Sequence, residues 1–307
     1  MMWLMVAILL SIVLPCAAVS SAVQPQRRRP LVAAREITAE PASVPVDTFD
    51  WLRSWYPVNV LSTMDPARSH PVQLLGISLV ANNDGAVVDG VKQPGRWHVC
   101  EDLLPPRTEP RQDRRQPALL SPRLVHAPQV NAGGRSYPAR EADGLLFVFP
   151  YNGVDAEAVA AAVPLPLIDE LHDPALEGRW KWKIPAGVRD FPCSWDAMVE
   201  NTLDPAHFCS AHHGTLGNRY TDPAPYEMRV TRSISKEAGF AVDGDLGRVE
   251  FVPPCLVKYV PNYSAMPFNG ALVIATYCVP IKPGWVRPLA NVLLDDQVGS
   301  EWDLSRI

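Results

Sequence analysis

Proline is the residue that most restricts how this chain can fold. The sequence holds 32 prolines in 307 residues. Proline has no amide hydrogen to donate within a helix or a central strand, so it is confined mainly to turns, sheet edges and the ends of elements. We therefore expect loops, short strands and short helices in place of long helices. With 47% hydrophobic residues the chain can still bury a sizeable core, and its length suggests two domains.

The first half of the ordered chain is predicted to be a small β domain. Residues 72–81 are rich in β-forming side chains, and residues 82–85 (Asn-Asn-Asp-Gly) are a strong turn signal. Further short strands are expected at 96–100 and 144–150. Residues 103–129 are dense in Pro and Arg and lack periodicity, so we expect a loop there.

The second half is predicted to be α+β. Residues 155–163 are a short Ala-rich helix candidate, and residues 195–203 are a second candidate with Ser194 as the N-cap. From Tyr226 onward apolar and polar residues alternate with a period of two, which indicates an antiparallel sheet. Helix segments laid against a twisted sheet are the expected architecture.

Composition and charge exclude several classes of function. The net charge is −5 and no basic patch is interleaved with aromatic residues, so we expect no nucleic acid as a partner. Apart from Cys16 in the N-terminal apolar run, five cysteines remain, and no Cys-x-x-Cys occurs among them. An odd number of widely spaced cysteines predicts neither a disulfide framework nor a zinc ribbon.

Residues 200–213 carry the clearest chemical signature. Two neutral imidazoles and one carboxylate can occupy one face of a ferrous ion and leave the other face open to dioxygen and substrate. A five-residue offset turns about 140° on a straight helix, so two such histidines share a metal only if the helix bends or unwinds. The alternative is a polar helix end whose histidines are only hydrogen-bonded. The pattern reads Asn201-x-x-Asp204-x-x-His207-x-x-x-x-His212, with Pro205 placed to end a helix.

This spacing resembles the iron-binding signature of Rieske-type non-haem iron oxygenases. It is most similar to their plastid branch, which includes pheophorbide a oxygenases, chlorophyllide a oxygenases and translocon-component relatives. Residues 49–51 (Phe-Asp-Trp), 55–58 (Trp-Tyr-Pro-Val) and 75–80 are similar to the start of the Rieske domain in that branch. The resemblance implies a β-rich, Rieske-like N-terminal domain at 48–155. A helix-grip (START-like) catalytic domain with an antiparallel sheet would follow at 160–307.

The resemblance also implies roles for the residues of the motif. His207 and His212 would bind a mononuclear Fe(II). Asp204 would be the carboxylate that connects the iron with its electron donor, and Asn201 would lie beside the site. The substrate would be a tetrapyrrole and the reductant ferredoxin-like. A homotrimer and association with the thylakoid or envelope membrane are implied as well.

The Rieske half departs from the family pattern. A Rieske [2Fe–2S] cluster needs two thiolates and two imidazoles, supplied as Cys-x-His and Cys-x-x-His. Leu104 stands at the expected Cys and Pro106 at the expected His, and neither side chain can bind iron. Cys100 and His98 occur in the reverse order, and we interpret them as strand residues. We therefore predict no cluster-binding residues in this sequence.

The third iron ligand is expected on a late helix. Residues 291–297 resemble the start of that helix, which makes Asp296 the candidate ligand and Asp295 the second choice. Two adjacent acids can also be only solvated. The interval before them is short for the family, so we expect the catalytic domain to be incomplete at its C-terminus.

Residues 1–40 are interpreted as a targeting presequence and linker. Residues 1–19 are an apolar run, and small residues that suit signal cleavage follow it. Residues 23–35 contain four arginines and no acid. A signal sequence followed by a basic segment resembles the bipartite presequence that carries proteins into complex plastids. Ordinary secretion is the alternative.

Three functions stay open at the level of sequence. One is a Rieske-type oxygenase. The second is a catalytically impaired relative that binds a tetrapyrrole or a lipid without turnover. The third is a mononuclear-metal protein that uses an external reductant. Iron content distinguishes the second function from the other two, because only the second predicts none.

Overall fold

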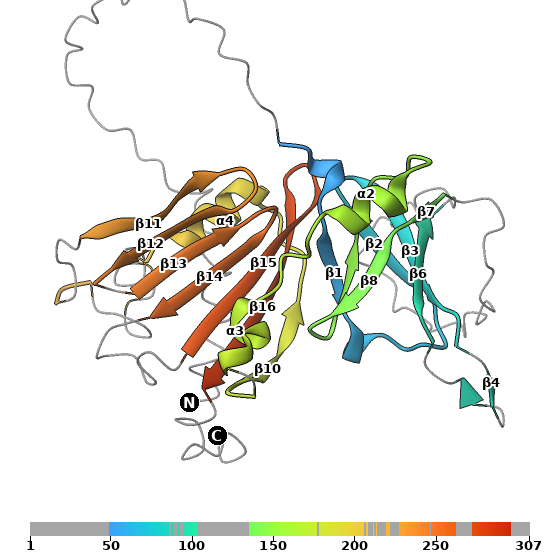
Figure 1. The fold of residues 1–307 in the computed structure, drawn as a ribbon, viewed down its shortest axis with the longest axis horizontal. Helices are drawn as coiled ribbons and strands as arrows, with labels where there is room; N and C mark the ends of the chain where they lie inside the picture. Colours follow the sequence, from blue (N-terminus) through green and yellow to red (C-terminus); the bar gives the residue numbers. More distant parts are fainter. Residues whose placement is uncertain are drawn as a thin grey trace, which may run out of the picture.

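A computed structural model gives the fold of the chain (Figure 1). It describes residues 49–102 and 135–295, apart from gaps at 86, 89–90, 93–94, 177, 206, 208–210, 212, 214–218, 222–226, 246 and 262–271. The expected presequence at 1–40 and the expected loop at 103–129 lie outside the described residues.

The N-terminal half is built from short antiparallel strands, as the sequence predicts. One sheet has the order β1-β9-β8, a second has the order β2-β3-β6-β7, and β4 and β5 form a separate ribbon. The strands β1 and β9 are buried along most of their length, so their apolar residues form the centre of this half. The strands are β1 (Tyr56–Val60), β2 (His70–Leu74), β3 (Ile77–Asn83), β4 (Val87–Val88), β5 (Val91–Lys92), β6 (Trp97–Glu101), β7 (Ser136–Tyr137), β8 (Ala139–Ala142) and β9 (Leu145–Val148).

The C-terminal half is one seven-stranded antiparallel sheet with the order β10-β16-β15-β14-β13-β12-β11. The predicted alternation places this sheet correctly from residue 228 onward. The strands are β10 (Trp180–Val188), β11 (Met228–Ser235), β12 (Gly239–Gly244), β13 (Gly247–Val252), β14 (Leu256–Pro261), β15 (Leu272–Lys282) and β16 (Trp285–Asp295). The helices are α2 (Ala156–Ala162), α3 (Asp169–His172) and α4 (Trp195–Leu203), with 3-10 turns η2 (Trp51–Arg53), η3 (Leu61–Thr63) and η4 (Pro174–Leu176).

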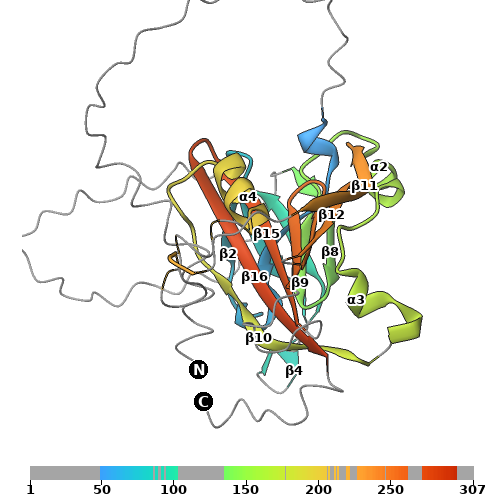
Figure 2. The ribbon, with the colours of Figure 1, turned by 90° about the vertical axis from the view of Figure 1, so that its left-hand side faces the viewer.

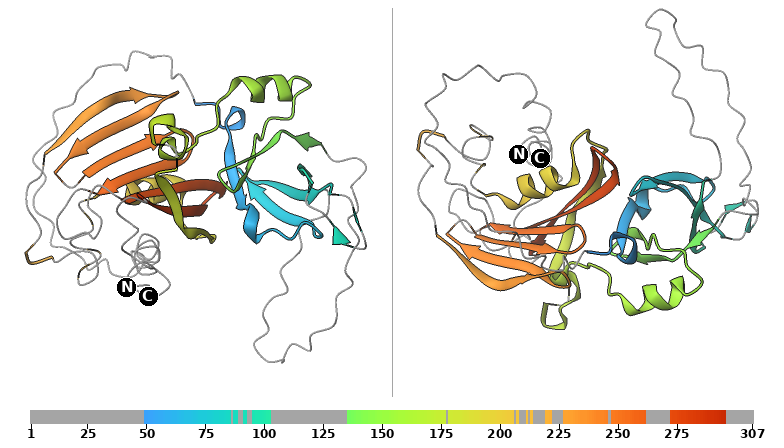
Figure 3. Two further views of the ribbon diagram at one scale, coloured as in Figure 1. Left: turned by 60° about the horizontal axis from the view of Figure 1, so that its bottom comes forward. Right: turned by 90° about the horizontal axis from the view of Figure 1, so that it is seen from above.

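Helix α4 lies against one face of the curved sheet, and α3 lies on the other face (Figures 2 and 3). Met198 and Val199 are buried between α4 and the sheet. On the sheet side, Val257, Cys278 and Val286 complete this apolar cluster. A helix held against an antiparallel sheet in this way confirms the predicted α+β, helix-grip fold.

The two halves share one hydrophobic core. Phe147 of β9 packs edge-on against Tyr277 of β15. Their ring centroids are 5.9 Å apart, within the range of about 4.5–7 Å that such aromatic pairs prefer. Leu75 and Gly76 both have positive φ angles, 51° and 81°, as a tight two-residue hairpin turn requires. Their amide groups donate to the carbonyl oxygens of Pro280 (2.9 Å) and Ile281 (2.6 Å). The turn between β2 and β3 therefore docks on the end of β15.

The expected helix at 291–297 is wrong. Residues 291–295 belong to β16, which lies between β10 and β15. Val292, Leu293 and Leu294 are all buried because a central strand of this sheet is covered on both faces. A continuous apolar run does not distinguish such a strand from a buried helix, and this is why the sequence misleads here. Asp296 lies outside the described residues.

The packing of α4 on the sheet predicts a contrast between two valines of the same sheet. Val257 is 1% exposed beneath α4, whereas Val230 on the edge strand β11 is 67% exposed. Val257→Ala should lower the free energy of unfolding by about 2 kcal/mol, because it removes buried methyl groups and leaves a cavity. Val230→Ala is the matched control and should change it by less than about 0.5 kcal/mol. Chemical denaturation measures both, and equal losses would contradict the packing.

Candidate functional site

Helix α4 carries the first residue of the motif, Asn201, and ends just before the second, Asp204. Ser194 stands at its N-cap position in an extended conformation, as predicted. Asp204 caps the C-terminus, with φ −89° and ψ 104°, and its amide donates to the carbonyl oxygen of Glu200 (3.1 Å). Pro205 follows, and a residue before proline is disfavoured in the helical region. The helix therefore stops at Leu203, as the proline predicts.

Asp204 and His207 come into contact because the helix ends at this point. The Nδ1 atom of His207 lies 2.5 Å from the backbone carbonyl oxygen of Asp204 and 3.8 Å from its carboxylate. A carbonyl oxygen can only accept a hydrogen bond, so Nδ1 carries the proton in the neutral ring and the lone pair lies on Nε2. Histidine ligands of metals are commonly held in this way through the nitrogen that does not bind the metal. The His207 side chain is 14% exposed.

The other predicted site residues are only partly described. Asn201 is half-buried on the last turn of α4. His212, Asp296, Leu104 and Pro106 lie outside the described residues. Within the part of the chain that the structure describes, no three His, Cys, Asp or Glu side chains are arranged to hold a metal ion. The structure thus joins Asp204 with His207, and the iron ligands, His207 included, stay predictions.

Asp295, the second choice for the third ligand, has a clear partner. Its carboxylate is 1% exposed, and the guanidinium of Arg179 binds it at 2.6 Å. The hydrogen bond and the charge of Asp295 raise the pKa of Arg179. This ion pair lies where β16 meets the start of β10, since Asp295 is paired with Trp180 in the sheet.

A hollow of about 490 Å³ lies along α4. The residues lining it alternate between apolar and acidic positions of the helix: Trp195, Asp196, Val199, Glu200, Leu203 and Asp204. The sequence analysis does not single out the three acids among these residues. Their spacing at i, i+4 and i+8 places them on one side of the helix once the helix is known.

The comparisons with known proteins agree with this fold. No protein-family model matches the sequence. The chain is 25% identical over 283 residues to pheophorbide a oxygenase of Oryza sativa subsp. japonica, covering 81% of this chain and 51% of the relative. It is 22% identical over 302 residues to flavonoid 8-hydroxylase 2 of Ocimum basilicum, covering 81% and 54%. The chain thus spans about half the length of these curated relatives.

A solved structure has a similar fold. NdmA of Pseudomonas putida CBB5 superposes with a TM-score of 0.51 at 16% sequence identity, covering 80% of this chain and 74% of NdmA. The chain is similar in sequence to Rieske-type non-haem iron oxygenases of the plastid branch, among them pheophorbide a oxygenase and chlorophyllide a oxygenase.

The residues of the N-terminal half do not fit the [2Fe–2S] cluster that these relatives imply. No Cys-x-His pair occurs in the sequence. His98 and Cys100 lie on strand β6, which confirms their interpretation as strand residues. The Nε2 atom of His98 pairs with the Asp84 carboxylate at 2.7 Å, and this contact lowers the pKa of Asp84. Burial raises the pKa of the Cys100 thiol, which opposes the thiolate form that a cluster needs.

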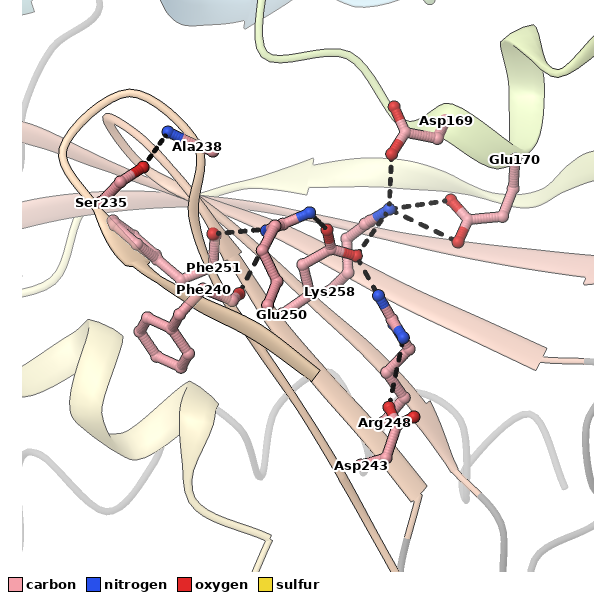
Figure 4. Close-up of polar contacts among 11 residues, drawn as sticks. Asp169, Glu170, Ser235, Ala238, Phe240, Asp243, Arg248, Glu250, Phe251 and Lys258 are labelled. Atoms are coloured by element: carbon pink, nitrogen blue, oxygen red, sulfur yellow. Dashed lines mark hydrogen bonds and ion pairs between the residues drawn. The ribbon is translucent and has the colours of Figure 1, made fainter. Parts of the chain in front are cut away.

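The chain also holds a buried charge network on the face of the sheet opposite α4 (Figure 4). The Lys258 ammonium is 3% exposed and contacts the carboxylates of Glu250 (3.0 Å), Asp169 (3.3 Å) and Glu170 (3.4 Å). Glu250 and Lys258 are cross-strand partners in β13 and β14. Asp169 and Glu170 belong to α3, so Lys258 ties that helix to the sheet. Arg232 also pairs with Glu250.

The charges around Glu250 and Lys258 favour the ionised form of both groups. Burial on its own raises the pKa of Glu250, but the charges of Lys258 and Arg232 outweigh it and the net pKa is lowered. Burial on its own lowers the pKa of Lys258, but Glu170, Glu250 and Asp169 outweigh it and the net pKa is raised. Sequence reasoning missed these residues, because their partnership depends on strand register.

Lys258→Met should destabilise the fold by about 3–5 kcal/mol, because it leaves Glu250 buried with one fewer cation. Because the folded pKa of Glu250 is lowered, its stabilising contribution is present above its unfolded pKa and disappears as the pH falls through the lower, folded value. The Lys258→Met loss should therefore shrink in acid. Urea denaturation at neutral and acidic pH measures this effect.

Lys236→Met is the control for this test, since the Lys236 side chain is 45% exposed and pairs only loosely with Glu237 at 3.9 Å. Adding Glu250→Gln to Lys258→Met should recover part of the stability, because the uncompensated carboxylate is then gone. A loss of stability that does not depend on pH would contradict the network. A double variant less stable than Lys258→Met alone would contradict it as well.

Proposed function

We propose that this chain belongs to an oxygenase that acts with dioxygen on a chlorophyll-derived tetrapyrrole, such as pheophorbide a or chlorophyllide a. The homology to the plastid branch supports the reaction class. The contact between His207 and the Asp204 carbonyl is the observation that carries the proposal. A polar helix end needs no fixed tautomer, whereas a metal ligand does.

The proposed site holds one mononuclear Fe(II), bound by His207, His212 and Asp296. Bound iron of this type supplies the activation of dioxygen. In this chain the Asp204 carbonyl orients the His207 ring and keeps the proton on Nδ1. The Asp204 carboxylate lies beside the same ring and places a negative charge there. Asn201, three residues earlier, would lie on the side of α4 that faces the site.

The electrons for this reaction would come from outside the described chain. The family pattern implies a [2Fe–2S] cluster, but the residues present do not fit one. A ferredoxin-like reductant is therefore the proposed electron donor. We further propose that residues 48–155 form the degenerate Rieske-like domain and residues 160–307 the catalytic domain.

The proposed location is the plastid, reached through the bipartite presequence at 1–40. Five of the curated relatives carry the word chloroplastic in their names, which supports this location. A homotrimer and association with the thylakoid or envelope membrane are proposed for the full-length protein. No helix among the described residues is long and apolar enough to cross a membrane.

Bound iron tests the site directly. The purified protein should contain ferrous iron, and His207→Ala should lower its affinity at least ~10-fold, because a ligand is lost outright. His98→Ala is the matched control, since His98 is exposed on β6 and pairs with Asp84. Metal analysis after dialysis measures the loss. Equal iron in the two variants would remove His207 from the site.

Activity is tested with the same proteins. The wild-type chain, reduced ferredoxin, dioxygen and pheophorbide a or chlorophyllide a should give an oxygen-dependent product that mass spectrometry detects, and His207→Ala should give none. Tetrapyrrole binding without iron and without product would support a binding protein in place of an oxygenase.

A further inference from the structure

Strand β11 is the outer edge of the seven-stranded sheet (Figure 1). Among the described strands only β12 pairs with it, so its other side presents backbone amide and carbonyl groups that no described strand uses. Edge strands are usually protected by lysine, proline, bulges or a short length. β11 has two register irregularities against β12, but it is eight residues long and contains neither lysine nor proline. This edge is therefore only partly protected against pairing with another strand.

Exposed apolar side chains gather on the same strand. Val230 is 67% exposed, Ile234 is 82% exposed, and Met228 is exposed as well. No other strand among the described residues carries more than one exposed large apolar side chain. Apolar groups that gather on a surface commonly mark a contact with another protein. The strand thus combines backbone hydrogen-bonding groups with apolar side chains that a second strand could cover.

The charges at the two ends of β11 indicate which strand would fit. Glu227 immediately precedes β11 and Lys236 immediately follows it, and both side chains are exposed. An antiparallel pair of identical strands brings the start of one strand opposite the end of the other. With a twofold axis between Thr231 and Arg232, Glu227 of each copy therefore lies opposite Lys236 of the other copy. Side chains of unlike charge that are directly opposite each other stabilise such a pair.

The two arginines of the strand are compatible with this arrangement. The Arg232 guanidinium is turned back onto its own sheet, where it pairs with Glu250 and donates to backbone carbonyl oxygens of β12 and β13. Its charge is thereby compensated within its own copy. In the same register Arg229 lies opposite Ile234, so no two arginines face each other directly. Centring the axis on Arg232 would place its two copies opposite each other, so the charges select the first register.

We propose that β11 pairs with β11 of a second copy of this chain, antiparallel and about a twofold axis. The two sheets then continue into each other, and the contact covers the backbone groups and apolar side chains of both edges. The ion pairs between Glu227 and Lys236 set the register, because exposed charges add little affinity but do fix orientation. A twofold contact uses the same patch on both copies and closes on itself. This inference is independent of the proposed oxygenase activity.

Sedimentation equilibrium of the full chain over a range of concentrations tests this pairing. It is measured at low ionic strength, where exposed charges are least screened. The wild type should associate to twice its starting mass, whether the starting particle is one chain or the proposed homotrimer. Lys236→Glu should raise the dissociation constant of this step at least ~10-fold, because it places glutamates opposite each other at both ends of the contact. The double variant Glu227→Lys/Lys236→Glu exchanges the two charges and should restore the wild-type constant.

Lys282→Glu is the matched control, since it reverses the charge of another exposed lysine, at the end of β15. It should leave the dissociation constant unchanged. If circular dichroism shows that Lys236→Glu is unfolded, Glu227→Lys replaces it under the same criterion. A wild type that does not associate overturns the proposal. An association that the single charge reversal leaves unchanged, or that the double variant fails to restore, overturns it as well, because the copies then meet elsewhere.

Discussion

The packing of α4 against the sheet is the contact on which the candidate site depends. A nine-residue helix is too short to be stable alone in water, so its existence relies on burial of its inner face. Met198 and Val199 supply that face, and Val257 and Cys278 receive it. The position of α4 then fixes where its C-terminus falls. Asp204 and His207 meet because the helix stops there.

Much of the fold is readable from local patterns. The second helix candidate, with Ser194 before it, is found as predicted, because N-cap chemistry and helix propensity act over a few residues. The sheet from Met228 onward follows its alternation. In contrast, the sequence patterns do not predict β10 and β16 as strands. β16 is buried on both faces and has no period of two, and β10 pairs with it through an irregular register.

In the candidate site too, local contacts must be distinguished from contacts that depend on the fold. The contact between Asp204 and His207 is local, but the sequence analysis does not predict it. The proton position on His207 depends on a backbone carbonyl and cannot be read from residue types. Glu250 and Lys258 are eight residues apart, and only the strand register shows that they face each other. The contact between Trp51 and Trp195 joins the start of the described chain to helix α4 and has no local signal in the sequence.

The attachment of the N-terminal half has a consequence for how this sequence could change over time. The half is held by the amides of Leu75 and Gly76, the Phe147 ring and the carbonyl oxygen of Val58, which Arg287 binds at 3.2 Å. None of these groups is a thiol or an imidazole. Selection for folding therefore acts on a different set of atoms from selection for a redox centre. Cluster ligands can therefore be lost from such a half while it keeps its shape and its contacts with the sheet.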